Sequence, residues 1–162
     1  MHHCLPPVTR PDTRLLVLGS LPGSRSLARQ QYYAHPRNQF WRLIGAAIER
    51  DLTPLRYQAR LAALLAAGVG LWDTVAVATR AGSLDSAIRL HAASDVAGLA
   101  ARLPELRAIA FNGGTSARIG RRELAGVEGI DLVDLPSSSP AYTLPFEVKS
   151  ERWLRLRAYL RH

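Results

Sequence analysis

The chain has 162 residues, of which 48% are hydrophobic, and this length and composition suffice for one domain with a single core. Neither a repeat nor a linker divides the chain, so residues 1–162 are expected to form one domain. The lone cysteine, Cys4, excludes a disulfide scaffold and a cysteine-bound metal centre. The apolar runs are far shorter than the ~20 residues of a membrane span, which predicts a cytoplasmic protein that meets no membrane. The formal net charge of +8 favours nucleic acid as partner, although a GC-rich genome alone would also enrich arginine.

The first half of the chain alternates apolar runs with helical patterns. Residues 14–18 form a short apolar run that predicts a buried strand, and helical periodicity follows at 39–50 and 55–67. Gly68 comes next and suits the left-handed end of the second helix. The apolar run 69–72 then predicts a second strand.

The same alternation continues to the end of the chain. Helical patterns follow at 94–103, 115–124 and 149–160, and apolar runs that predict strands stand between them at 108–111 and 130–135. Ser94 can cap the first of these helices, and Asp131 and Asp134 favour an edge position for the last strand. The order predicts an α/β fold: a single three-layer domain with a central, mostly parallel four-stranded sheet flanked by helices.

Small and polar residues follow each predicted strand. Ligands of parallel sheets bind beyond the carboxyl ends of the strands, so these residues are candidates for a site. They are Gly19-Ser20-Leu21-Pro22-Gly23, Asp73-Thr74, Asn112-Gly113-Gly114 and Pro136 to Pro140. The first group exposes backbone amides, and taken alone it fits an ordinary turn as well as a phosphate loop that lacks the Lys-Ser/Thr ending.

The segment after that turn narrows the choice. Tyr32 to Trp41, following the Gly-x-x-Pro-Gly turn, resembles the first motif region of mismatch-specific uracil and thymine glycosylases. Leu71 to Val75 is similar to the strand end that carries the base-recognising residue of that superfamily, and Leu135 to Ala141 to the loop that wedges into DNA. Because the motifs stand in order over most of the chain, it resembles the uracil-DNA glycosylase superfamily.

Two departures point to one branch of the superfamily. Where most members carry a catalytic Asp or Asn, this chain has Leu21, which can neither orient water nor act as a base. Ser137-Ser138-Ser139-Pro140 stands where other branches carry a His-Pro-Ser motif. Both features resemble the hypoxanthine-DNA glycosylase branch, and that resemblance implies Asn38 as the catalytic residue.

The resemblance gives roles to four side chains, each beside an alternative. Asn38 would orient the attacking water, or would cap the following helix. Tyr33 would stack under a flipped base, or would pack on the sheet. Asp73 would accept the N1 hydrogen of hypoxanthine, which adenine lacks, or would cap the amides of Thr74 and Val75. Asn112 would bind near the base, or belong to an Asn-Gly-Gly turn.

The remaining candidates are backbone and loop residues. Gly19, Ser20, Leu21, Pro22 and Gly23 are expected to bind substrate, and Ser137, Ser138, Ser139 and Pro140 to contact DNA as a minor-groove wedge or to form a plain polar loop. His35 and His91 have no companion at metal-ligand spacing, which favours loop packing. Asp85 lies in a segment similar to the same branch, and no role follows for it.

The expected activity is hydrolysis of the N-glycosidic bond of a deaminated base in DNA, hypoxanthine above all, leaving an abasic site. No metal and no cofactor are expected, and since no lysine stands in the motifs, a monofunctional glycosylase is predicted. The partner would be double-stranded or single-stranded DNA that contains a deaminated base, bound by a monomer. A uracil or broad deaminated-base glycosylase and a non-catalytic nucleic-acid-binding member remain alternatives.

Overall fold

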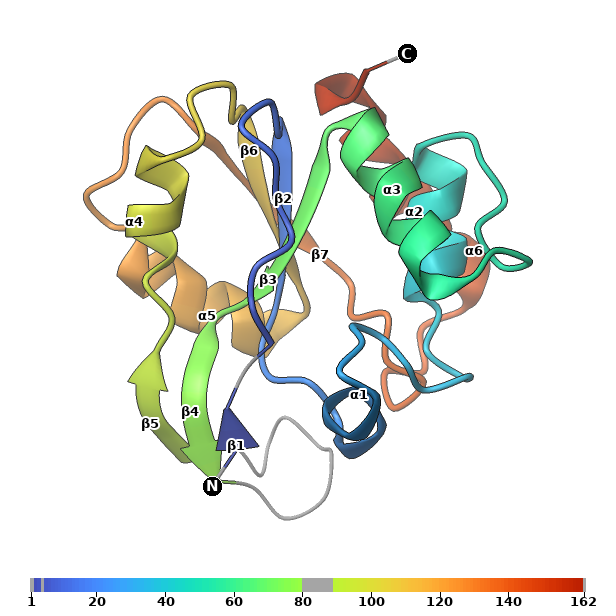
Figure 1. Cartoon of the computed structure of the whole chain (residues 1–162), viewed down its shortest axis with the longest axis horizontal. Helices are drawn as coiled ribbons and strands as arrows, with labels where there is room; N and C mark the ends of the chain where they lie inside the picture. Colours follow the sequence, from blue (N-terminus) through green and yellow to red (C-terminus); the bar gives the residue numbers. More distant parts are fainter. Residues whose placement is uncertain (1, 4, 80–88, 162) are drawn as a thin grey trace.

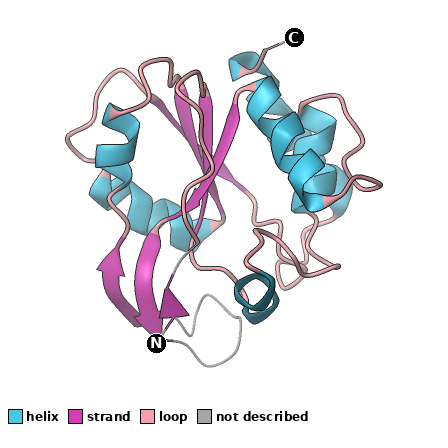
Figure 2. Cartoon of the chain, in the orientation of Figure 1, coloured by secondary structure: helices cyan, strands magenta, loops and turns pink. Residues whose placement is uncertain are grey.

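A four-stranded parallel sheet forms the centre of the protein. The computed structural model describes residues 2–3, 5–79 and 89–161. The strand order is β3 (Val69–Asp73), β2 (Leu15–Gly19), β6 (Ala108–Asn112) and β7 (Asp131–Leu135), and all neighbours run parallel (Figure 2). The sequence prediction of the sheet is confirmed, including the edge position of the strand with two aspartates.

Helices cover both faces of this sheet because its central strands bury side chains on both sides. Leu15 and Val17 of β2 pack with α2 (Phe40–Ala47), α3 (Tyr57–Ala67) and α6 (Phe146–Trp153). Leu16 and Leu18 point the other way, toward α4 (Val96–Ala101) and α5 (Gly114–Glu123). Figure 1 shows the three layers, with α2, α3 and α6 on one side and α4 and α5 on the other. The predicted three-layer α/β fold is confirmed.

Helix ends follow the expected chemistry with two corrections. Gly68 ends α3 in the left-handed conformation, at φ +96°. The cap of α4 is Asp95, whose carboxylate accepts the Gly98 amide, and the prediction of Ser94 as the cap was wrong because the Ser94 backbone continues the strand pairing by donating to Thr74. The last helix begins at Phe146 rather than Lys149, and it continues from Trp153 as the 3-10 helix η2 (Leu154–Tyr159).

Two parts of the fold were not predicted. A short helix α1 (Ser24–Arg29) follows the turn after β2. A second, antiparallel sheet has the order β1 (His2–His3), β4 (Val75–Thr79) and β5 (Arg89–Ala93). The chain enters β4 directly from β3, and the amides of Thr74 and Val75 donate to the carbonyls of Gly19 and Ser20 at the turn. In the described part of the chain, no helix has the length and apolar character needed to span a membrane.

Candidate active site

A cavity of about 640 Å³ lies beyond the carboxyl ends of the parallel strands. Every residue that the sequence assigned to catalysis, substrate or DNA lines it, and these thirteen residues come from the ends of all four strands and from the segment that precedes α2. They are Gly19, Ser20, Leu21, Pro22, Gly23, Tyr33, Asn38, Asp73, Asn112, Ser137, Ser138, Ser139 and Pro140. The parallel topology therefore gathers side chains separated by more than a hundred positions.

Asn38 lines the cavity, and its side-chain oxygen belongs to a hydrogen-bonded network. Its Oδ1 accepts the Phe40 amide at 2.9 Å and the Ser138 hydroxyl at 2.7 Å. A backbone N–H needs an acceptor, so this contact fixes which end of the amide is the oxygen. Within residues 5–79 and 89–161, no acceptor pairs with Nδ2. Asn38 therefore anchors the start of α2 through its oxygen and keeps two N–H donors for a ligand.

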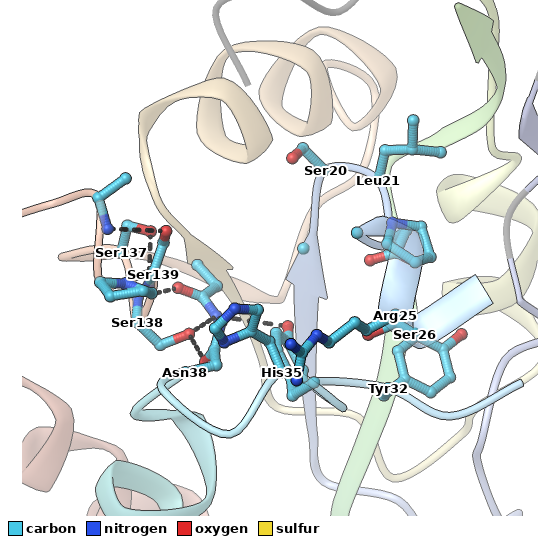
Figure 3. Close-up of a pocket in the computed structure, with 18 of the residues that line it drawn as sticks. Ser20, Leu21, Arg25, Ser26, Tyr32, His35, Asn38, Ser137, Ser138 and Ser139 are labelled. Carbon is cyan, nitrogen blue, oxygen red and sulfur yellow. Dashed lines mark hydrogen bonds between the residues drawn. The ribbon is translucent and has the colours of Figure 1, made fainter. Parts of the chain in front are cut away.

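Ser138 and Asn112 hold the oxygen side of Asn38 in place. The Ser138 amide donates to Asn112 Oδ1 at 2.9 Å, and Asn112 Nδ2 donates to the Ser138 hydroxyl at 2.9 Å. The hydroxyl in turn donates to Asn38, and the carbonyl of Ser138 accepts the Gln39 amide at 3.0 Å. Figure 3 shows this relay between the Ser137 to Ser139 loop and Asn38. The relay ties the loop after β7 to the segment that begins α2.

This relay changes the interpretation of the loop. Ser138 is only 1% exposed and its polar groups are all engaged inside the protein, so the expected contact of Ser138 with DNA does not fit the structure. Ser137 and Ser139 are partly exposed and Pro140 is exposed. The outer part of the loop therefore remains the candidate for DNA contact, and Ser138 is a structural link.

Tyr33 lies on a stack of aromatic rings. Its ring is parallel to that of Phe40, with centroids 4.0 Å apart and an interplanar angle of 14°. Phe40 is fully buried and meets Trp153 edge-on. The Tyr33 backbone has φ +53°, a conformation that costs a non-glycine residue energy, and the indole N–H of Trp41 holds its carbonyl at 3.1 Å. Tyr33 is thus both packed from behind and exposed to the cavity.

Asp73 places a carboxylate at the inner wall of the cavity. The residue is 3% exposed and lies against Gly19, where an added Cβ would stand 2.6 Å from Asp73 Oδ1 and 3.1 Å from the Tyr33 hydroxyl. Only glycine leaves room for these two side chains. The Thr74 and Val75 amides, which Asp73 could alternatively cap, donate to the carbonyls of Gly19 and Ser20.

The family model of the Uracil DNA glycosylase superfamily matches residues 6–160. The chain belongs to this superfamily. The resemblance drawn from the motifs is confirmed, and residues from each of those motifs line the cavity.

Relatives within the superfamily cover nearly the whole chain. A protein of Methanosarcina acetivorans named "Hypoxanthine DNA glycosylase" is 39% identical over 159 residues, 97% of this chain and 96% of its own. A protein of the same name from Methanosarcina barkeri is 36% identical over 148 residues, 91% of this chain and 92% of its own. A solution NMR structure of a candidate uracil DNA glycosylase from Methanosarcina acetivorans has a TM-score of 0.88 at 37% identity, and the match covers 99% of this chain and 98% of that one.

Several residues of the cavity wall were not predicted from the sequence. They are Ser24, Arg25, Ser26, Tyr32, His35, Ala141 and Tyr142. Residues 24–26 belong to the unpredicted helix α1. His35, expected to pack in a loop, does bind its own loop by accepting the Arg37 amide at Nδ1, yet it also faces the cavity. Asp85 lies outside the described residues, and the side chain of His91 is not described.

Replacing Ser138 by alanine tests the relay. Ser138→Ala removes the nearer of the two hydroxyl acceptors of Asn112 Nδ2, leaving the Tyr33 hydroxyl at 3.3 Å, and takes one donor from Asn38 Oδ1. We therefore expect the free energy of unfolding to fall by about 1–3 kcal/mol. Urea denaturation measures this loss. Ser137→Ala is the control, because that partly exposed hydroxyl accepts a single bond from the Ser139 amide. Equal losses in both variants would contradict a special structural role for Ser138.

Proposed function

We propose that the protein excises hypoxanthine from DNA by hydrolysing the N-glycosidic bond of deoxyinosine, leaving an abasic site. The observation that carries the proposal is the convergence of the Asn38 amide, the Tyr33 ring and the Asp73 carboxylate on one cavity. The names of two relatives, 36–39% identical over more than nine-tenths of the chain, support the choice of base. The net charge of +8 suits a DNA substrate.

Base recognition rests on Tyr33 and Asp73. A base inside a duplex is out of reach of the cavity, so the nucleotide has to leave the stack and enter it. The Tyr33 ring, supported by Phe40, offers an aromatic face for the base. The Asp73 carboxylate, when ionised, only accepts hydrogen bonds, so it can take the N1 hydrogen of hypoxanthine. Adenine has no hydrogen at N1 and would leave the buried carboxylate without that bond.

Bond cleavage rests on Asn38. Leu21 packs with Val75 and Ile119 and is 7% exposed, so an apolar side chain fills the position where other branches carry an acid or amide. The Asn38 oxygen is already engaged by Phe40 and Ser138, and the donors on Nδ2 are left to hold a water by its lone pair. An amide is no base at neutral pH, so this positions the water without deprotonating it.

The reaction then follows the pattern of other glycosidic cleavages. The bond from C1′ to N9 breaks first, both electrons go to the base, and the sugar becomes oxocarbenium-like. The oriented water adds its oxygen to C1′, and the proton that it loses is matched by one gained by the departing base. An early departure of the base explains why a positioned water suffices in place of a general base.

Cleavage of defined duplexes tests the proposal. Labelled duplexes with a single inosine, uracil or xanthine would be incubated with the protein and then cleaved with alkali at abasic sites. We expect alkali-sensitive sites in the inosine duplex at the highest rate. Faster cleavage of uracil would favour the broader glycosylase, because the N3 hydrogen and O4 of uracil present the same donor and acceptor. Binding of all duplexes without any cleavage would contradict the enzyme.

A further inference from the structure

The protein has a single lysine, and that lysine is buried. Of the 21 basic residues, 20 are arginine and one is Lys149 on α6. The side chain of Lys149 is fully enclosed, with 1% of the residue exposed. Lysine and glutamate are among the residues that are least often buried, because removing a charge from water is costly without a partner. A buried lone lysine beside the candidate site therefore requires an explanation.

The ammonium of Lys149 contacts neutral groups. Nζ donates to Gln39 Oε1 at 2.9 Å and to the Ser139 carbonyl at 3.2 Å, and it lies 5.3 Å from the centre of the Tyr142 ring. Among the described residues, no carboxylate lies within ion-pair distance of it. Burial lowers the pKa of this ammonium. A compact ammonium can direct donors at separate acceptors, whereas the planar guanidinium of arginine is larger and aims its donors in a fork.

These contacts join the two segments that carry the candidate site. The segment at residues 38–39 and the loop at 138–139 are already linked by the Gln39 amide to the Ser138 carbonyl and by the Ser138 hydroxyl to Asn38. Lys149 adds a further link, from the Gln39 side chain to the Ser139 carbonyl. It approaches from α6, which packs beside α2 (Figure 1). The loop at 138–139 and Lys149 on α6 therefore both hold residues 38 and 39 in place.

We propose that Lys149 is a positioning residue for the glycosylase reaction, holding Gln39 and Ser139 together and thereby fixing the Asn38 amide toward the cavity. This inference rests on the proposed function. An apolar side chain would fill the same space with less desolvation cost, so the ammonium contributes geometry rather than net stability. Nζ is turned toward Gln39 and Ser139, and Lys149 is not among the residues that line the cavity, so it takes no part as a nucleophile.

Replacing Lys149 by methionine tests whether Lys149 positions the candidate site. Lys149→Met keeps an unbranched side chain but removes the donors and the charge. We expect single-turnover cleavage of an inosine duplex, at saturating enzyme, to slow by roughly tenfold or more, because displacement of a group that positions a reactant is costly. Affinity for the abasic product duplex should stay close to that of the wild type. Arg152→Met is the matched control, since it removes one exposed charge from the same helix.

A double-mutant cycle shows whether Lys149 acts through Asn38. If it does, Lys149→Met should slow the residual cleavage of Asn38→Ala far less than it slows the wild type. Full multiplication of the two effects would overturn the proposal, and so would cleavage by Lys149→Met at the wild-type rate. If Lys149→Met fails to fold, Gln39→Ala removes the acceptor instead, and an unchanged cleavage rate in that variant would overturn it equally.

An NMR measurement tests the positioning role of Lys149 without depending on the proposed glycosylase activity. Should the wild type leave inosine DNA intact, the proposed function fails, and the position of Asn38 can still be followed by the NMR signals of its side-chain amide. We expect these signals to shift in Lys149→Met and to stay in place in Arg152→Met. Unshifted signals in Lys149→Met would overturn the positioning role on structural grounds alone.

Discussion

Asn38→Ala is expected to lower the single-turnover rate on an inosine duplex by about 100-fold or more, because the two N–H donors that hold the water are lost. The variant also loses the contact from Oδ1 to the Phe40 amide, which stabilises the start of α2 by about 1 kcal/mol. The rate should therefore be measured well below the unfolding midpoint. DNA affinity should largely remain, because Asn38 is one contact within a wide cavity.

Asn38→Asp is the matched variant for the donor argument. Aspartate keeps an oxygen for Phe40 and Ser138 and replaces the Nδ2 donors by a second acceptor. If the donors position the water, Asn38→Asp should be impaired nearly as much as Asn38→Ala. Cleavage by Asn38→Asp at or above the wild-type rate would show that an acceptor serves there, and cleavage by Asn38→Ala within a few-fold of wild type would move catalysis elsewhere.

The strands were predictable because each one carries its own signal. Leu15 to Leu18 and Ala108 to Phe111 are buried on both faces, and a short continuous apolar run is what such burial requires. Helix α1 had no comparable signal, since it has only six residues and its N-cap residue, Gly23, offers no side chain to cap it. The strand β4 follows β3 after a single residue, so its start is set by hydrogen bonds to the turn after β2 and not by a local break in the pattern.

The candidate site was predictable where it depends on strand ends, and unpredictable where it depends on packing. Asp73 and Asn112 are the last residues of β3 and β6, so the parallel topology alone brings them together. The burial of Ser138 and Lys149 follows from contacts with Asn112 and Gln39, which lie 26 and 110 positions away along the chain. No local pattern encodes such contacts. The single lysine in an arginine-rich chain was the one available signal.

Substitutions of Asp73 are expected to change the choice of base. In Asp73→Asn, one oxygen can still accept from N1 of hypoxanthine, and the new amide can donate to O6, so inosine cleavage should survive in part. Uracil presents the same pair at N3 and O4, so its rate relative to inosine should rise. The isosteric side chain keeps the place of the carboxylate beside Gly19, where an added Cβ would stand 2.6 Å from Asp73 Oδ1.

Asp73→Ala should impair both substrates, because neither hydrogen bond to the base remains. The loss should exceed about tenfold for inosine, since a recognition site that misses its hydrogen bonds rejects a substrate strongly. Single-turnover rates of the wild type and both variants on inosine and uracil duplexes measure the effect. Asp95→Asn, a change at the α4 cap of a residue that does not line the cavity, is the control for a lost carboxylate. Rates and substrate ratios that stay unchanged in both Asp73 variants would leave the buried carboxylate a structural group and place base selection on other residues.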